Sequence, residues 1–287
     1  MPSAGADDAK PAAAAQPRAA ISHVIFDMDG LLIGIFVAAS EHNRVSFLHD
    51  VHHLTEVTPM GVGADTEGFY TVVQEKILSR YGKVFDWSLK AKMMGKTTAE
   101  SMRILFEECG LTGLLTPEEF LHEHEIMLKE LLPSCVAMPG VLRLIQHLHT
   151  NGIPIAVATR THKHHFALKT QNHQEVFSLM HHIVTGDDPE VKAGKPSPDI
   201  FLAAMRRFDY SNDAVCFGSV SEHVEPGNCL VFEDAPLGVE AAKTAGMHVV
   251  MVPVARLDVA HHKGADQVLR SLLDFNPCEW GLLPFKD

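Results

Sequence analysis

Two carboxylates that could take part in a reaction, Asp27 and Asp29, stand two positions apart after the apolar run His23–Phe26 and before Gly30. In an extended chain, residues two apart point to the same side and lie about 7 Å from each other. Two like charges at such a distance favour a cation between them or a proton on one of them. The pair predicts either a divalent-metal site with a carboxylate nucleophile or a polar turn that ends a buried strand.

Further polar residues occur at the ends of later apolar runs or in the loops beside them. They are Thr159, Lys195, Glu233 and Asp234. The carboxyl ends of parallel strands meet at one edge of a sheet, which is where ligands bind. A carboxylate can attack phosphorus, while a hydroxyl and an ammonium can hold phosphate oxygens. Taken singly, Thr159 fits a core threonine and Lys195 a surface lysine, but the ordered set predicts a phosphoryl-transfer site.

The elements that must position these residues alternate between strand and helix. Apolar β-branched runs predict strands at 23–26, 153–159, 182–185, 229–232 and 248–252, and helices are expected at 141–149, 165–171, 197–208 and 237–245. This order is typical of an α/β fold with a Rossmann-like parallel sheet and helices on both faces. The sequence predicts helices over residues 65–138. One of them should begin at a capping sequence formed by Thr116, Pro117 and Glu119.

Composition excludes several classes of protein. The chain has 287 residues and a net charge of −12, which argues against a nucleic-acid surface. No apolar stretch reaches membrane-spanning length, and five scattered cysteines suit a reducing compartment, so we expect a cytoplasmic protein. Residues 1–20 are Ala/Pro-rich, lack a signal-peptide core and predict a disordered tail. Histidine clusters at 162–165 and 181–182 lack a metal-ligand spacing, so surface histidines are expected.

With these motifs in order, the chain resembles the haloacid dehalogenase-like hydrolases. The matching stretches are Phe26–Gly30, Thr159, Gly194–Phe201 and Val231–Pro236. Residues 186–191 and 238–243 narrow the likeness to the group with pseudouridine 5'-phosphatase and the glycerol-3-phosphatases. The resemblance implies an α/β core at 21–32 and 139–287, with a small α-helical cap domain at 65–138 inserted after the first strand. Residues 33–64 interrupt the pattern as an irregular insertion.

The resemblance also implies a role for each matching residue. Asp27 would be the nucleophile, and Asp29 would protonate the leaving group and then activate water. Asp27, the backbone carbonyl of Asp29 and Asp234 would hold Mg²⁺, with Glu233 close by or bound through water, and an all-oxygen site suits this ion. Thr159 and Lys195 would bind phosphate. Lys96, in the cap, is either a substrate contact or a surface lysine.

These motifs lead to one preferred function and two alternatives. The leading hypothesis is a monomeric, Mg²⁺-dependent phosphatase for a small phosphorylated metabolite, with glycerol 3-phosphate ahead of pseudouridine 5'-phosphate. Alternatives are a phosphoglucomutase-like phosphotransferase and a folded but inactive protein whose 33–64 insertion, native or a gene-model error, blocks the site. Arg160 also departs from the family, which usually has a small residue there; it reaches the phosphate or points outward.

Overall fold

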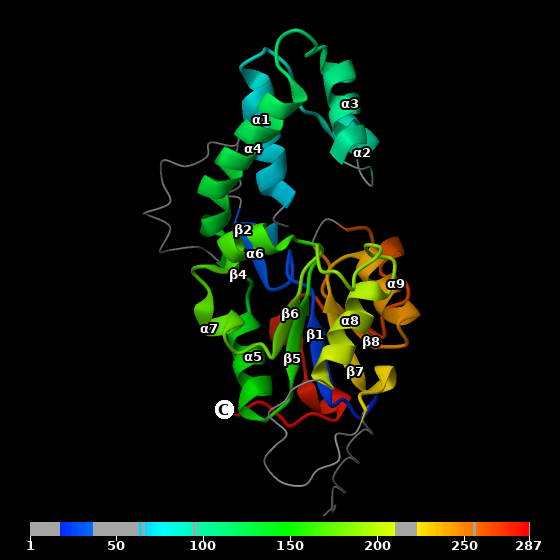
Figure 1. Cartoon of the computed structure of the whole chain (residues 1–287). Coiled ribbons are helices and arrows are strands. Elements are labelled where there is room, and N and C mark those ends of the chain that lie inside the picture. Colours follow the sequence, from blue (N-terminus) through cyan, green and yellow to red (C-terminus); the bar gives the residue numbers. More distant parts are fainter. Residues whose placement is uncertain are drawn as a thin grey trace, which may run out of the picture.

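The computed structural model describes residues 18–36, 63–64, 67–93, 96, 98–209, 223–254 and 257–286. Its centre is a six-stranded sheet in the order β6-β5-β1-β7-β8-β9, in which each neighbouring pair is parallel. The strands are β1 (His23–Phe26), β5 (Ile155–Ala158), β6 (His182–Val184), β7 (Cys229–Glu233), β8 (His248–Met251) and β9 (Gln267–Val268). Strands β5 and β6 lie on one side of β1, and β7, β8 and β9 lie on the other (Figure 1). Strand β1 is therefore at the switch point of the strand order, where open sheets bind ligands.

Helices cover both faces of the sheet because β1 is apolar on both. Val24 and Phe26 pack with α5 (Val141–Thr150) and α7 (Gln174–Phe177). Ile25 packs on the other side with α8 (Asp199–Phe208) and α9 (Pro236–Thr244). Helix α6 (Lys163–Thr170) follows β5 and begins two residues earlier than the sequence predicts. The predicted α/β fold with helices on both faces of a parallel sheet is confirmed.

Four helices form a separate group above the carboxyl edge of the sheet, which we call the helical unit (Figure 1). They are α1 (Glu67–Ser79), α2 (Trp87–Met93), α3 (Thr98–Cys109) and α4 (Pro117–Leu131). The predicted start of α4 is confirmed as a capping box, since Thr116 Oγ1 accepts from the Glu119 N–H at 3.1 Å and Glu119 Oε2 accepts from the Thr116 N–H at 2.8 Å. Among the described residues, no helix is long and apolar enough to cross a membrane.

A small second sheet, which the sequence did not predict, connects the core to the helical unit. Its order is β3-β2-β4, with β2 at Ile33–Phe36, β3 at Gly63–Ala64 and β4 at Val136–Ala137. The described ends of the 33–64 segment are thus paired antiparallel strands. Residues 37–62 and the tail residues 1–17 lie outside the described residues. Short 3-10 helices complete the fold at Leu132–Ser134, Pro226–Asn228, Val259–His261, Leu272–Asp274 and Pro277–Trp280.

Candidate active site

The first carboxylate, Asp27, is placed by the strand that precedes it. Its backbone N–H donates to the Phe232 carbonyl at 2.9 Å, which continues the β1–β7 pairing, and the residue is 7% exposed. The chain then turns sharply, since the Gly30 N–H donates to the Ile33 carbonyl at 2.8 Å. Gly30 has a φ of 85°, a left-handed conformation that glycine adopts without steric cost. The turn sends the chain away from the sheet directly after Asp29.

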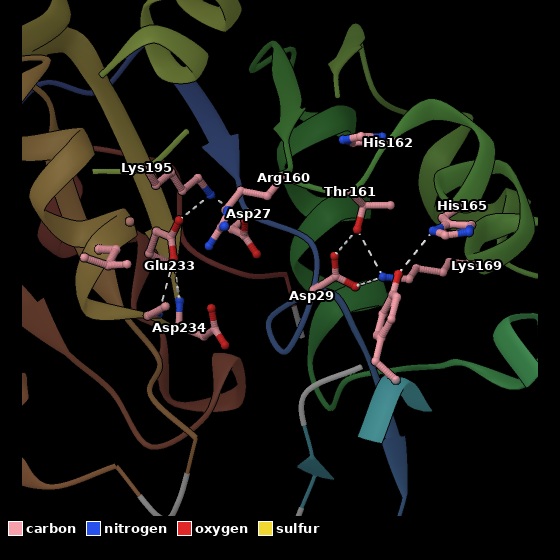
Figure 2. Close-up of a pocket in the computed structure, with 14 residues that line it drawn as sticks. Asp27, Asp29, Arg160, Thr161, His162, His165, Lys169, Lys195, Glu233 and Asp234 are labelled. Carbon is pink, nitrogen blue, oxygen red and sulfur yellow. Dashed lines mark hydrogen bonds and ion pairs between the residues drawn. The ribbon is translucent and has the colours of Figure 1, made fainter. Parts of the chain in front are cut away.

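Lys195 joins two of the predicted carboxylates. Its ammonium donates to Asp27 Oδ1 at 2.5 Å, to Glu233 Oε1 at 2.5 Å and to the carbonyl of Ala158 at 3.2 Å. These contacts use all three ammonium donors of a side chain that is only 4% exposed. Such a buried lysine requires partners of this kind, because an unpaired buried charge is strongly unfavourable. Lys195 is therefore part of the site and not a surface lysine (Figure 2).

Glu233 and Asp234 complete the acidic group at the end of β7. Glu233 Oε2 accepts from the N–H groups of Asp234 at 3.1 Å and Ala235 at 3.2 Å. Helix α9 packs against this carboxylate through Gly238, where an added Cβ would stand 1.9 Å from Glu233 Cδ. Only glycine allows that approach. The local chain thus fixes the orientation of Glu233.

Asp29 has partners that the sequence interpretation missed. Lys169, from α6, donates to Asp29 Oδ1 at 2.7 Å and to Thr161 Oγ1 at 3.0 Å. The Thr161 hydroxyl donates to Asp29 Oδ2 at 2.6 Å. The Lys169 ammonium also lies 5.5 Å from the centre of the Tyr70 ring, a residue of α1 in the helical unit. Asp29 is thus held by the core and lies near the helical unit (Figure 2).

These residues surround a pocket of about 440 Å³. It brings together the predicted Asp27, Asp29, Lys195, Glu233 and Asp234, and adds Tyr70, Arg160, Thr161, His162, His165, Lys169, Ala235, Leu237 and Gly238. Thr159 is fully buried behind this lining, where its hydroxyl donates to Asp29 Oδ2 at 3.4 Å. Lys96 lies in the helical unit, outside the pocket lining, with its ammonium 3.9 Å from Glu100 Oε1.

Arg160 points into the pocket beside Asp27 (Figure 2). Its backbone is fixed by a close approach to Gly186, since a Cβ on that glycine would stand 2.2 Å from the Arg160 carbonyl oxygen. Among the residues that the structure describes, its guanidinium has no hydrogen-bond or ion-pair partner. The pocket therefore contains a cation that is available to an anionic ligand.

Burial and charge shift the protonation of the two central groups. Burial raises the pKa of Asp27 to about 7, although the Lys195 ammonium opposes the shift. Burial alone would lower the pKa of Lys195, but the carboxylates of Asp27 and Glu233 raise it above its ordinary value. Lys195 therefore stays charged at neutral pH, and Asp27 needs cationic neighbours to stay ionised in its buried position.

The acidic residues also fit a divalent cation. Asp27, Glu233 and Asp234 are buried, and each offers a carboxylate oxygen within 4.8 Å of the others. Their formal charge of −3 faces the single positive charge of Lys195. Carboxylate oxygens are the ligands that Mg²⁺ prefers. The donor set therefore suits Mg²⁺ better than a softer metal.

Comparisons with known proteins agree with this geometry. The model of the haloacid dehalogenase-like hydrolase family matches residues 21–246. Two Arabidopsis thaliana proteins, (DL)-glycerol-3-phosphatase 1, mitochondrial, and (DL)-glycerol-3-phosphatase 2, are 53% and 52% identical, over 94% and 96% of this chain and 76% and 98% of their own lengths. A probable pseudouridine-5'-phosphatase of Drosophila melanogaster is 38% identical over 93% of this chain and 96% of its own length.

A solved structure supports the fold alone. The HAD family hydrolase from Deinococcus radiodurans R1 superposes with a TM-score of 0.61 at 21% identity, and the match covers 93% of this chain and 99% of that chain. The resemblance inferred from the motifs, and the enzyme class of phosphoric monoester hydrolase that it implied, are confirmed by the family match and the curated relatives.

Proposed function

Because the chain belongs to the haloacid dehalogenase-like hydrolases, we propose that it hydrolyses glycerol 3-phosphate through a phosphoryl group carried on Asp27. The observation that supports this most directly is the buried Asp27 carboxylate, which faces the pocket with Lys195 on one side and Glu233 and Asp234 close by. A carboxylate can act as a nucleophile toward phosphorus when nearby cations offset the charge of both partners. Asp27 has such a cation in Lys195.

The proposed reaction has two displacements at phosphorus. An oxygen of Asp27 forms a bond to phosphorus as the bond from phosphorus to the ester oxygen breaks, and Asp29 gives its proton to the departing alkoxide. Asp29 then takes a proton from water as the water oxygen attacks phosphorus, which releases phosphate and restores Asp27. The first step therefore uses the protonated form of Asp29 and the second step its carboxylate. The contacts from Lys169 and Thr161 stabilise the carboxylate, so Asp29 must take up a proton before it can act in the first step.

We also propose Mg²⁺ as the cofactor, held by Asp27, Asp234 and the backbone carbonyl of Asp29, with Glu233 close by. When bound, Mg²⁺ would offset the negative charge that Asp27 and the phosphate bring together. Lys195 favours the ionised form of Asp27 and orients it, and its buried position excludes water from one side of the nucleophile. Lys195 alone does not offset the formal charge of the three carboxylates, which is why we propose a divalent cation as well.

One further residue would bind the phosphate in our proposal. Arg160 lines the pocket with an unpartnered guanidinium among the described residues, and such a group can hold two phosphate oxygens at once. The Thr161 hydroxyl instead donates to Asp29 Oδ2, and the predicted Thr159 supports Asp29 from behind the lining. We therefore assign phosphate contact to Arg160. The phosphate contact that the motifs predict for Lys195 requires the ammonium to release one of its three present acceptors.

The helical unit is proposed to act as the cap that closes over the substrate's alcohol part. Tyr70, from α1, already lines the pocket, so the unit contributes to its wall. Closure of this kind excludes water from a phosphorylated carboxylate. The cap assignment, a monomeric state and a cytoplasmic location stay predictions, as does a contact between substrate and Lys96.

Glycerol 3-phosphate is preferred over pseudouridine 5'-phosphate because relatives named for the former are 52–53% identical, against 38% for the relative named for the latter. The test is a panel of both esters and a hexose phosphate, compared by kcat/KM with free phosphate as the readout. We expect glycerol 3-phosphate to lead and EDTA to abolish turnover until Mg²⁺ is restored. A preference for the nucleotide would reverse the substrate assignment, and activity indifferent to chelation would contradict the cofactor.

A further inference from the structure

A second cluster of metal-binding residue types lies at the contact between the helical unit and the core. Glu125 is on α4, and His164 and His165 are consecutive residues of α6. His164 Nε2 lies 3.1 Å from Glu125 Oε1, and His165 Nε2 lies 2.9 Å from Glu125 Oε2. One potential ligand atom of each residue lies within 4.8 Å of the others. The sequence alone suggested surface histidines, because the 162–165 cluster lacks a metal-ligand spacing; the third residue, Glu125, stands 39 residues before His164.

The donor set and its surroundings suit a late first-row divalent cation. Two imidazole nitrogens and one carboxylate form a common ligand set for Zn²⁺. The other ring nitrogen of His165, Nδ1, lies 3.2 Å from the Tyr70 hydroxyl, the kind of outer contact that orients a metal-binding histidine. Without a cation, Nε2–H donates to Glu125 and Nδ1 accepts from the Tyr70 hydroxyl. A bound cation takes the place of the Nε2 proton, and Nδ1–H can then donate to the tyrosine oxygen.

The spacing requires only limited adjustment. Ligand atoms that each lie 2.0–2.1 Å from a tetrahedral zinc stand about 3.3 Å apart. The two observed histidine–carboxylate distances, 2.9 and 3.1 Å, are within a few tenths of an ångström of that value. They end on different oxygens of Glu125, so the carboxylate must rotate to offer one oxygen to the ion or bind through both. The side chains of His164 and Glu125 are 59% and 34% exposed, so an ion can reach them from solvent. The nearest competing cation, the Lys129 ammonium, lies 3.9 Å from Glu125 Oε1, beyond hydrogen-bond distance.

We propose that Glu125, His164 and His165 form a metal site for Zn²⁺ or a similar late first-row divalent cation, with water as the fourth ligand, separate from the carboxylate site at Asp27. Its ligands come from α4 of the helical unit and α6 of the core, so the bound ion joins the two parts. His165 also lines the pocket, which places the ion at the pocket's rim. Occupancy therefore holds the helical unit against the core and slows its opening.

Co²⁺ provides the direct test, because four-coordinate Co²⁺ absorbs visible light much more strongly than the six-coordinate ion. The full chain is titrated with Co²⁺ in excess Mg²⁺, which occupies the carboxylate site. We expect one equivalent of Co²⁺ to give an intense visible band that Zn²⁺ removes by competition. Glu125→Gln keeps the shape of the side chain, and His164→Ala removes an exposed ring; each should weaken Co²⁺ binding at least tenfold.

His122→Ala is the matched control, since His122 is an exposed residue of the same helix α4 and lies outside the cluster. It should bind Co²⁺ as the parent does, and circular dichroism should show all variants folded. Zn²⁺ should also raise the Tm of the parent and of His122→Ala but not that of the other two variants. Absence of the intense band in the parent, or an equal band in Glu125→Gln and His164→Ala, overturns the proposal and leaves the cluster as a hydrogen-bonded contact only.

Discussion

The core edge and the helical unit use charged residues in opposite ways. At the core edge, the side chains of Lys195 and Lys169 are 4% and 1% exposed and are paired with carboxylates of the pocket. In the helical unit, Lys92 and Arg103 are 50% and 60% exposed and pair with glutamates on the surface. Exposed pairs contribute little to stability, whereas a buried charge that loses its partner is costly. The difference agrees with the proposal that the buried pairs serve the chemistry of the site.

The largest expected effect follows from changing the nucleophile. Asp27→Asn should lower kcat/KM at least about a thousandfold, because an amide cannot attack phosphorus and binds a cation poorly. The fold should remain, since Lys195 keeps Glu233 as a partner. Steady-state kinetics with circular dichroism check this. Activity within tenfold of the parent would reject Asp27 as the nucleophile.

The comparison between regions is tested by one substitution made in each. Lys195→Met should destabilise the protein by about 3–5 kcal/mol, because the carboxylates of Asp27 and Glu233 lose their buried partner. Lys92→Met removes an exposed partner of Glu108 and should change stability by no more than about 0.5 kcal/mol. Urea unfolding of both variants measures the difference. Equal changes in the free energy of unfolding would show that burial does not determine how much each ion pair contributes to stability.

A partly buried histidine, His182, makes the stability of the core depend on pH. Burial lowers the pKa of His182 to about 4, from an ordinary value of 6.5. Between pH 6.5 and about pH 4, His182 binds a proton in the unfolded chain but stays neutral in the folded chain. Acidification therefore favours unfolding. This contribution to stability is complete above pH 6.5 and is lost progressively as the pH falls to about 4. The total is on the order of 3 kcal/mol at most.

His182→Gln should therefore flatten the decline in stability between neutral pH and pH 4. The glutamine amide can still donate to the Ala204 carbonyl, which the His182 ring nitrogen contacts at 2.9 Å. Urea unfolding of parent and variant at several pH values provides the measurement. A decline of the same size in both proteins would mean that other groups cause it.

Arg160 should affect binding more than chemistry. Arg160→Ala is expected to raise KM for the phosphate ester about tenfold with little change in kcat, which corresponds to roughly 1.4 kcal/mol of lost binding. Arg103→Ala, in the helical unit, removes an exposed guanidinium paired with Glu107 and should leave KM unchanged. An unchanged KM in Arg160→Ala would show that its guanidinium does not contact the substrate.

The sequence could predict the features that local motifs encode, but not the contacts that form only when distant segments meet in the folded chain. Asp27, Lys195, Glu233 and Asp234 were grouped correctly because strand ends of a parallel sheet must meet at one edge. Lys169 was missed because lysine on a helix is usually a surface residue, and only the folded chain reveals its carboxylate partner. Strands of two to four residues, such as those of the second sheet, leave too short an apolar pattern to be recognised.

The smallest effect is expected in the 33–64 segment, where the sequence departs most from the family pattern. Strands β2 and β3 pair antiparallel with Phe36 opposite Gly63, so the ends of the 37–62 segment are held side by side. An Asn-Gly turn can therefore replace residues 37–62 and preserve both strands, whereas removal of all of 33–64 would also delete the pairing of β2 with β4.

Since β2 and β4 connect the core to the helical unit, retaining them should preserve the geometry of closure. The shortened chain should keep kcat/KM within about threefold of the parent, a barrier change of roughly 0.6 kcal/mol. Shortening the connection between β2 and β3 should also stabilise the protein by at most about 2 kcal/mol, if the cost of closure rises by about 0.6 kcal/mol with each doubling of its length. Kinetics and urea unfolding of the two chains measure both quantities. A large gain in activity would instead mean that the segment obstructs the pocket, and a large loss would make it a working part of the enzyme.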